Sequence, residues 1–388
     1  MAVLEKEFVK FMGQFDACPF EIITGEKSHF IGKGEPKFSV TVHKLPGMKS
    51  LLKSTSIALG EAYMDGDIEI HGDLYETLNL FLGQIDKFYT DRWKLRKLMF
   101  TSGDKNNQKR EVSSHYDIGN DFYRLWLDET LSYSCGYFKE NDTTLYEAQC
   151  CKVERILEKL NLKEGMTLCD IGCGWGFLLM EAAKKYKVYG MGITLSQEQQ
   201  KKCKERIKEE GLEEYVHVKL LDYRDLPELH IKFDRVVSVG MLEHVGRNNY
   251  LEFMSCVKRM LKPGGLFLLH YISALKEYPG DAWVKKYIFP GGVVPSLREI
   301  INIAGDLRFY TLDVEDLRRH YNKTLLCWNE NFQRHRSEVA EMFDERFTRM
   351  WEMYLCACAA AFMNGVVDLH QILFSNDVNN EIPMTRWY

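Results

Sequence analysis

An acidic residue and three closely spaced glycines stand together in the sequence Asp170-Ile171-Gly172-Cys173-Gly174-Trp175-Gly176. Glycine lets a backbone turn tightly and approach a ligand, so a strand, an acid and glycines that open a helix indicate a nucleotide-type cofactor site. The dinucleotide fingerprint GxGxxG needs a further glycine where the chain has Phe177, and the acid expected about twenty residues later for the ribose of NAD is missing. A dehydrogenase is therefore disfavoured.

Four further segments hold side chains that could take part in catalysis, and each has a structural alternative. Cys135 lies in a turn among aromatic residues, which is often only a packed loop. Glu243 directly follows an apolar stretch, where it could act on a substrate or cap the next helix. His270 lies in an apolar stretch and could be a core residue, and Tyr321 belongs to a segment with the pattern of an amphipathic helix.

The elements that would position these residues begin after residue 150, where apolar strands alternate with helices, as in a mostly parallel α/β sheet. The expected strands are residues 167–171, 188–193, 216–221, 233–239 and 265–271. The expected helices are residues 152–160, 177–185, 197–210 and 249–261. Ligands of such sheets bind outside the carboxyl ends of the strands, so the residues after each strand should converge.

The ends of the first and third expected strands suggest the kind of cofactor. Asp170 could order its turn or face the cationic, amino-acid end of S-adenosylmethionine. Tyr223 and its neighbours Asp222 and Arg224 could hydrogen-bond to an adenine and stack on it, although Tyr223 could equally be packing. Together with the strand order, these residues predict a Rossmann-like S-adenosylmethionine methyltransferase sheet.

Length and composition set the domain organisation. The 388 residues suggest more than one unit, and we expect an N-terminal accessory domain at residues 1–100, a polar linker at 101–110 and a catalytic domain at 111–388. A net charge of −5 argues against a nucleic-acid-binding surface over the whole protein. The eleven cysteines include no CxxC pair, so we expect no zinc site and a reducing compartment. The N-terminus lacks a signal-peptide pattern, and the apolar run at 355–363 is about half the ~18 residues of a membrane span, so we expect a cytoplasmic protein.

Several ordered segments resemble the cyclopropane-fatty-acyl-phospholipid synthases, which are related to the mycolic acid cyclopropane synthases. The resemblance begins near residue 110 and continues to the C-terminus. It is carried by residues 115–123 (HYDIGNDFY), 133–135 (YSC), the glycine turn, 194–200 (TLSQEQQ), 222–225 (DYRD), 238–246 (SVGMLEHVG), 286–292 (KYIFPGG) and His320-Tyr321.

The resemblance implies that a cis double bond in a phospholipid acyl chain receives a methylene group from S-adenosylmethionine. It also implies a bound bicarbonate as the base, held by Cys135, Glu243, His270 and Tyr321, and it credits Cys358 with a catalytic role, although a thiol among alanines is usually a core residue. The cofactor residues that it implies are Tyr116, Tyr133, Ser134, Asp170, Gly172, Gly174, Gly176, Thr194, Ser196, Gln199, Asp222, Tyr223 and Arg224.

A phospholipid substrate requires contact with a bilayer surface, which we expect to be peripheral. The basic and aromatic stretch at residues 87–100 is a candidate for docking, or it could be a solvated helix. Family analogy favours a homodimer. The alternatives are a methyltransferase that adds a plain methyl group to an acyl chain or a small amine, and a catalytically silent module that binds S-adenosylmethionine or a membrane.

Overall fold

The computed structural model describes residues 2–87 and 118–388. Contacts divide the chain into two units. Unit 1 lies within residues 1–97, 280–288 and 325–366, and unit 2 lies within residues 98–279, 289–324 and 367–388. The linker at 101–110, Tyr116 and nearly all of the docking stretch lie outside the described residues. The domain boundaries, the role of Tyr116 and the docking role therefore stay predictions.

A seven-stranded sheet forms the centre of unit 2, in the order β10-β11-β9-β8-β5-β6-β7. The strands from β9 to β7 run parallel, and β11 is antiparallel to both β9 and β10. The predicted α/β class is confirmed. The strands are β5 (Thr167–Ile171), β6 (Tyr189–Thr194), β7 (Val216–Leu220), β8 (Phe233–Val239), β9 (Leu261–Ser273), β10 (Phe309–Asp316) and β11 (Asp368–Asn376).

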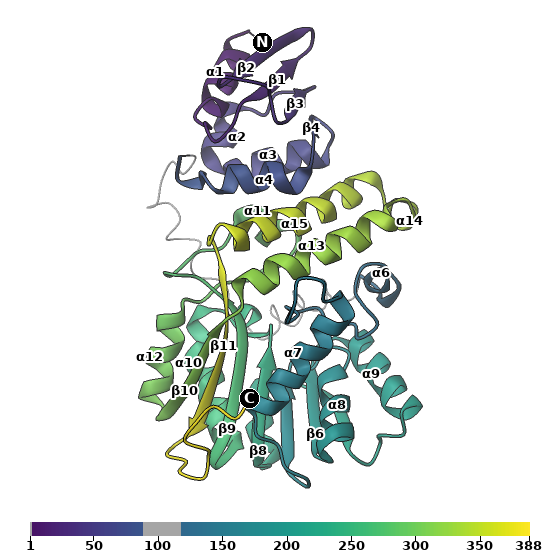
Figure 1. Ribbon diagram of the computed structural model, residues 1–388, viewed down its shortest axis with the longest axis vertical. Coiled ribbons are helices and arrows are strands. Elements are labelled where there is room, and N and C mark those ends of the chain that lie inside the picture. Colours follow the sequence, from purple (N-terminus) through teal and green to yellow (C-terminus); the bar gives the residue numbers. More distant parts are fainter. Residues whose placement is uncertain (1, 88–117) are drawn as a thin grey trace. The chain divides into compact units, whose positions relative to one another are not determined.

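Helices cover both faces of this sheet (Figure 1). One apolar cluster joins the sheet to α10 (Tyr250–Met260) and α12 (Leu297–Asp306). A second cluster joins the other face to α7 (Leu145–Lys159), α8 (Phe177–Tyr186) and α9 (Gln197–Glu209). Among the described residues, unit 2 also has the short helices α6 (Asn120–Arg124), η3 (Tyr223–Leu229), η4 (Leu242–His244) and η5 (Arg247–Asn249).

Local sequence explains where the helices next to the cofactor turn begin. α7 begins with a capping box in which Thr144 accepts from the backbone N–H of Glu147, whose side chain reaches back to the N–H of Thr144. Ser196 caps α9 by accepting from the N–H of Gln199. α8 begins after Gly176, whose φ of 82° suits glycine. These caps place the first turns of α8 and α9 beside the ends of β5 and β6.

Unit 1 contains a four-stranded sheet in the order β2-β1-β3-β4, with a core rich in phenylalanine that includes Phe15, Phe20 and Phe38. Its strands are β1 (Phe20–Thr24), β2 (Lys27–Ile31), β3 (Ser39–Val42) and β4 (Ile68–His71). The helices described in unit 1 are α1 (Ala2–Met12), α2 (Met48–Lys53), α3 (Thr55–Met64), α4 (Leu74–Leu82), η1 (Ile85–Lys87), α11 (Ala282–Tyr287), α14 (Arg336–Met342) and α15 (Glu345–Met363).

Late segments of the chain belong to unit 1 as much as the early ones do. α15 packs on α3 and α4, where the Nε of Arg349 donates to the carbonyl of Tyr63 at 2.6 Å. The side chain of Asn364, just after α15, donates to Asn79 at 2.7 Å. The helix α13 (Arg318–Arg334) is shared, because its residues up to Thr324 group with unit 2 and the rest with unit 1.

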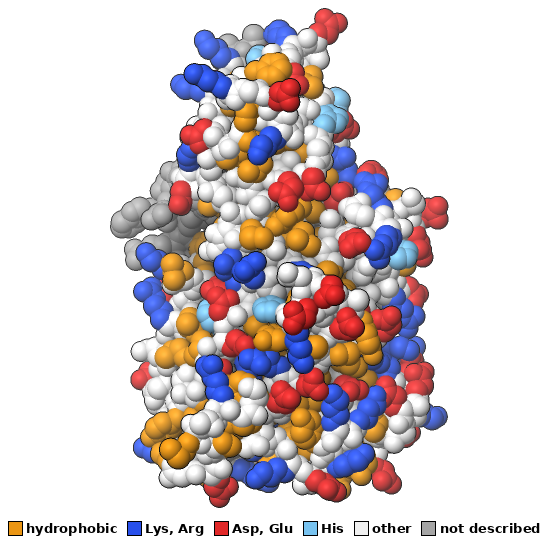
Figure 2. All heavy atoms as spheres, in the orientation of Figure 1, with side chains coloured by type: hydrophobic (Ala, Val, Ile, Leu, Met, Phe, Trp, Pro, Cys, Tyr) orange, Lys and Arg blue, Asp and Glu red, His pale blue; other side chains and the backbone are white. Residues whose placement is uncertain are grey.

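Charged side chains of both signs are interspersed with apolar ones on the visible face (Figure 2). Within the described ranges, no helix has both the length and the hydropathy that a membrane span requires.

Candidate active site

The glycine turn follows β5 and leads into α8, as the sequence predicts. Gly172, Gly174 and Gly176 all have positive φ angles, of 87°, 53° and 82°, which residues other than glycine rarely adopt. The backbone N–H groups of Gly172 and Cys173 both donate to the carbonyl of Ile193 at 3.0 Å. This tie to β6 fixes the turn against the sheet.

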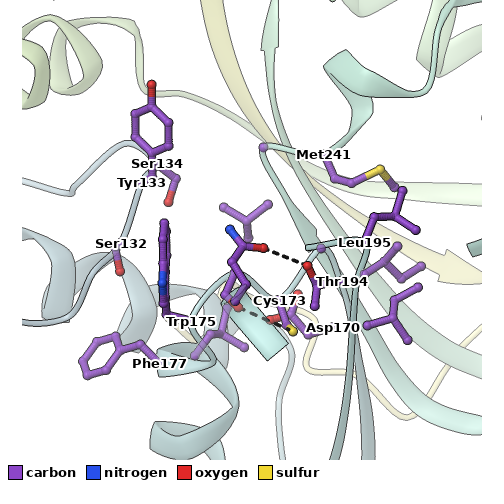
Figure 3. A pocket seen from close by; sticks show the side chains of 18 of the residues that line it. Ser132, Tyr133, Ser134, Asp170, Cys173, Trp175, Phe177, Thr194, Leu195 and Met241 are labelled. Atoms are coloured by element: carbon purple, nitrogen blue, oxygen red, sulfur yellow. Dashed lines mark hydrogen bonds between the residues drawn. The ribbon is translucent and has the colours of Figure 1, made fainter. Parts of the chain in front are cut away.

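A pocket opens at this turn, outside the carboxyl ends of β5, β6, β7 and β8. Figure 3 shows Tyr133, Ser134 and Trp175 on one side of it and Leu195 and Met241 on the other. Nine of the predicted cofactor residues line the pocket: Tyr133, Ser134, Asp170, Gly172, Gly174, Thr194, Gln199, Asp222 and Tyr223. The structure therefore brings together in one cavity residues that are almost a hundred positions apart.

Three other predicted cofactor residues support the pocket without lining it. Gly176 and Ser196 are the N-caps of α8 and α9. Arg224 donates to both carboxylate oxygens of Asp222, with its Nε at 2.8 Å from Oδ1. A carboxylate held by a guanidinium is fixed in direction.

Lys152 is a pocket residue that the sequence did not indicate as functional. It lies on α7, is 4% exposed, and its Nζ donates to the Oγ of Ser134 at 3.0 Å. Burial lowers its pKa to about 8, against the opposing effects of Asp128, Cys135 and Asp170. Its spacing from the buried Ala148 and Ile156 places it on the apolar face of α7, and this periodicity could have revealed it.

Asp170 lines the same pocket. Burial raises its pKa to about 7, and the nearby Lys152 opposes that rise. Its Oδ1 is buried and has no hydrogen-bond partner among the described residues. A buried acceptor without a partner costs free energy, so this oxygen is suited to accept from a ligand. With an acid and an amine in its lining, the pocket fits a ligand that carries both an ammonium and a carboxylate group.

Glu243 contacts β9, the strand that carries His270. The Oε1 of Glu243 accepts from the backbone N–H of Ile272 at 2.6 Å, two residues after His270. Burial raises the pKa of Glu243 to about 7 and lowers that of His270 well below its usual range. Among the described residues, neither the Oε2 of Glu243 nor the Nε2 of His270 has a hydrogen-bond partner.

The thiol of Cys135 and the backbone N–H of Tyr321 share one partner, the carbonyl of Leu317. The Sγ of Cys135 lies 3.8 Å from the carbonyl oxygen of Leu317, which also accepts from the backbone N–H of Tyr321 at 3.1 Å. Burial raises the pKa of the Cys135 thiol, so the thiol stays protonated. The charge of Lys152 contributes to the pKa shifts of both Cys135 and His270, after the larger effect of burial.

None of these four predicted catalytic residues lines the cofactor pocket, although His244, next to Glu243, does. Burial lowers the pKa of His244 to about 4, so its ring is neutral. The ring of Phe289 lies edge-on to that of His244, with ring centroids 6.0 Å apart. The same ring is stacked on Tyr133, with centroids 6.5 Å apart and an angle of 30° between the ring planes. An aromatic layer therefore adjoins the pocket.

Cys358 lies on α15 in unit 1, whereas the other four predicted catalytic residues lie in unit 2. Burial raises the pKa of its thiol to about 12, which makes it a poor nucleophile near neutral pH. Its catalytic role stays a prediction.

Gly192 on β6 is a second residue that the sequence did not indicate. A Cβ at this position would lie 2.7 Å from the Sγ of Cys173 and 2.8 Å from the Cδ1 of Leu179. We expect Gly192→Ala to lower the free energy of unfolding by about 1–3 kcal/mol, because the extra carbon overpacks the core and pushes the glycine turn. Thermal unfolding and titration with S-adenosylmethionine would measure both effects.

Gly305→Ala is the matched control, because a Cβ there meets nothing within 4 Å and the residue lies in helix α12. It should leave stability unchanged or raise it slightly. Equal melting temperatures for Gly192→Ala and the wild type would contradict the packing argument.

Known proteins match both parts of the chain. Residues 103–372 match the family described as mycolic acid cyclopropane synthetase, and residues 9–92 match a domain of unknown function. The chain is 41% identical over 344 residues to the cyclopropane-fatty-acyl-phospholipid synthase of Escherichia coli strain K12, which covers 87% of this chain and 88% of that protein. It is 38% identical over 361 residues to a probable fatty acid methyltransferase of Pseudomonas putida, covering 90% and 91%.

Solved structures agree with these matches. The mycolic acid cyclopropane synthase CmaA1 complexed with SAH and CTAB has a TM-score of 0.65 at 34% identity, covering 69% of this chain and 98% of that one. Coclaurine N-methyltransferase, with a TM-score of 0.67 at 20% identity, shares the fold over 83% of this chain and 99% of its own.

The α/β sheet, the glycine turn and the similarity to these enzymes thus define an S-adenosylmethionine-dependent methyltransferase, as predicted. Within this class, the chain belongs to the family of the mycolic acid cyclopropane synthetases. The resemblance inferred from the sequence is confirmed.

Proposed function

We propose that this enzyme adds a methylene group to the cis double bond of unsaturated acyl chains in membrane phospholipids and so forms cyclopropane fatty acids. S-adenosylmethionine supplies the methyl carbon, the alkene supplies the electron pair of the new bond, and S-adenosylhomocysteine and a proton are released as the ring closes. The observation that carries the proposal is that two buried atoms, the Oε2 of Glu243 and the Nε2 of His270, have no hydrogen-bond partner among the described residues. The 41% identity to a named cyclopropane-fatty-acyl-phospholipid synthase supports the substrate class.

The pocket residues divide the work of holding S-adenosylmethionine. Asp170 accepts from the ammonium of its amino-acid end, and Lys152, through Ser134, favours its carboxylate. Tyr223 packs edge-on against Phe253 with ring centroids 5.3 Å apart, which leaves it in the pocket lining beside Asp222 for the adenosine end.

We propose bicarbonate as the base, held by Cys135, Glu243, His270 and Tyr321. A bicarbonate ion carries one hydroxyl donor and acceptor oxygens. The unpaired Oε2 of Glu243 accepts from the hydroxyl and the Nε2–H of His270 donates to an oxygen, which orients the ion. The surrounding burial and the aromatic layer of Tyr133 and Phe289 exclude water, which would otherwise trap a carbocation.

An alternative is transfer of a plain methyl group to an acyl chain. The probable fatty acid methyltransferase of Pseudomonas putida, 38% identical to this chain, favours it. Both reactions begin with the same carbon–carbon bond and differ in where the proton leaves. The base therefore decides between them.

We further propose that the enzyme is cytoplasmic, binds the bilayer surface peripherally and forms a homodimer. The basic and aromatic residues at 87–100 would contribute to docking. Flotation with anionic liposomes, before and after these Lys and Arg residues are neutralised, addresses the docking role.

The product test uses vesicles of cis-unsaturated phospholipid with S-adenosylmethionine and, as control, vesicles of saturated phospholipid. We expect acyl chains that gain one CH₂ and show cyclopropane ring protons by NMR, with no product from saturated chains. Mass alone does not distinguish a ring from a methyl-branched alkene, so the NMR spectrum is decisive. A methyl branch would support the alternative, and no product at all would overturn the proposal.

The base is tested separately by removing bicarbonate from the buffer. Turnover should fall on degassing and return when bicarbonate is added. Turnover that is independent of bicarbonate would remove it from the mechanism while leaving the product assignment intact.

A further inference from the structure

Three buried side chains from distant parts of the chain form a hydrogen-bonded relay that ends on His270. Lys159 is the last residue of α7, Gln371 lies on β11, and His270 lies opposite Gln371 on β9. All three are 1% exposed. The Nζ of Lys159 lies 3.0 Å from the Oε1 of Gln371, and the Nε2 of Gln371 lies 3.1 Å from the Nδ1 of His270.

The chemistry of these groups leaves one arrangement of protons. An ammonium has donors only, so the atom of Gln371 that faces Lys159 must be its carbonyl oxygen. The amide NH₂ then faces the Nδ1 of His270 and must donate to it. A neutral imidazole carries one proton, so an accepting Nδ1 places that proton on Nε2.

His270 is neutral and Lys159 is charged, as the relay requires. Burial, followed by the charges of Lys152 and Lys159, holds the pKa of His270 well below its usual range. Burial also lowers the pKa of Lys159, but the Oε2 of Glu315 at 2.5 Å favours its ammonium form. Burial alone would raise the pKa of Glu315, yet Arg155 and Lys159 outweigh this effect and lower it.

We propose that Lys159 and Gln371 are positioning residues, which fix His270 in the neutral tautomer with its proton on Nε2 and so present a donor to a bound anion. The Nε2 is buried and has no acceptor among the described residues, which indicates that its partner is a ligand. The opposite tautomer would turn a lone pair toward the anion and set the Nδ1–H against the amide N–H of Gln371. The anion itself rests on the proposed function, whereas the tautomer does not.

Side-chain ¹⁵N NMR of protein labelled with ¹⁵N-histidine tests the proposal directly, in bicarbonate-free buffer. His270→Gln assigns the signals by removing them. We expect a protonated Nε2 and an unprotonated Nδ1 in the wild-type enzyme across neutral pH. A proton on Nδ1, or rapid averaging between the two tautomers, would overturn the proposal. Because the measurement is made on the wild-type protein, it does not depend on whether variants of Lys159 or Gln371 fold.

Gln371→Glu supplies the matched perturbation, because its carboxylate accepts from both neighbours and should draw a proton onto the Nδ1 of His270. The control is Gln333→Glu, because Gln333 is exposed and belongs to unit 1. This variant should leave the His270 signals unchanged. We expect Gln371→Glu to lower turnover about tenfold or more with little change in the KM for S-adenosylmethionine. An unchanged wild-type tautomer in a folded Gln371→Glu protein would also contradict the proposal.

The two proposals fail in different experiments. If the Nε2 of His270 is protonated but turnover is independent of bicarbonate, the base is wrong and the positioning role stands. If turnover depends on bicarbonate but the proton is on Nδ1, the relay is wrong and the base stands.

Discussion

Replacement of Glu243 by glutamine should lower turnover by a factor of about 100 to 10,000 while leaving the affinity for S-adenosylmethionine near that of the wild type. Glutamine has the same shape and can still accept from the N–H of Ile272, as Oε1 does now at 2.6 Å. It cannot place a second, charged acceptor where the unpaired Oε2 lies. Steady-state kinetics and calorimetric titration with S-adenosylmethionine would separate the two effects.

The loss of the Glu243 carboxylate should also change how activity depends on pH. The pKa of Glu243 is raised to about 7 by burial, so wild-type activity should rise as the pH rises through 7 and the carboxylate forms. The residual activity of Glu243→Gln should lack this rise. Exposed Glu213→Gln is the control and should retain the wild-type profile. Near-normal turnover of Glu243→Gln would remove Glu243 from the anion site.

The same substitution should stabilise the protein above neutral pH. A carboxyl group whose pKa is raised from 4.5 to about 7 on folding favours the folded state fully below pH 4.5, and this contribution is lost as the pH rises through 7. At pH 8, Glu243→Gln should therefore be more stable than the wild type by up to about 3 kcal/mol, and at pH 4.5 the two should be nearly equal. Urea unfolding at the two pH values would measure the difference.

Asp170→Asn should weaken the binding of S-adenosylmethionine about 10- to 100-fold, because it removes a charge-assisted hydrogen bond worth about 1.5–3 kcal/mol. The unpaired Oδ1 of Asp170 is the acceptor concerned. Burial raises the pKa of Asp170 to about 7, so wild-type affinity should increase as the pH rises through 7, and Asp170→Asn should not show this increase. Calorimetric titrations at several pH values would measure both effects.

Asp306→Asn, at the exposed end of α12, serves as the control and should bind like the wild type. If Asp170→Asn binds as tightly as the wild type at pH 8, Asp170 only orders the turn, which is the alternative that its position at the end of β5 also allowed.

The parallel part of the sheet could be predicted because its strands are short apolar runs separated by amphipathic helices. Glycines mark the turn after β5. β11 could not be predicted in this way, because its burial is nearly continuous and its polar residues, among them Gln371 and Ser375, do not alternate with apolar ones. β9 begins at Leu261, four residues before the expected start at 265, because Leu261 pairs with Phe233 of β8.

The site residues that lie at the ends of strands could be predicted from the sequence, whereas those on helices and on β11 were harder to predict. Asp170 lies at the end of β5 and Tyr223 follows β7, so topology predicts that both line the pocket, as they do. Glu243 also follows a strand, β8, but it does not line that pocket. Lys152 and Lys159 lie on a helix, where lysine is normally solvated. Lys152 shares the apolar face of α7 with Ala148 and Ile156, so periodicity could have indicated it, whereas Lys159 is recognised from its burial. Gln371 hydrogen-bonds to His270 and Lys159, which lie 101 and 212 positions earlier in the sequence. No local sequence pattern indicates contacts between residues so far apart.

Because the two units are interleaved along the chain, the protein cannot be divided into its units by a single cut in the sequence. The CmaA1 chain is covered almost completely by about two thirds of this one, and the synthetase family match begins at residue 103, after the N-terminal residues 1–97 of unit 1. Yet α15, encoded far downstream, packs on α3 and α4 of that segment. Deleting residues 1–97 would remove the surface of α3 and α4 on which α15 packs, so we expect the truncated chain to be destabilised in residues 325–366 and not to behave as an independent catalytic module.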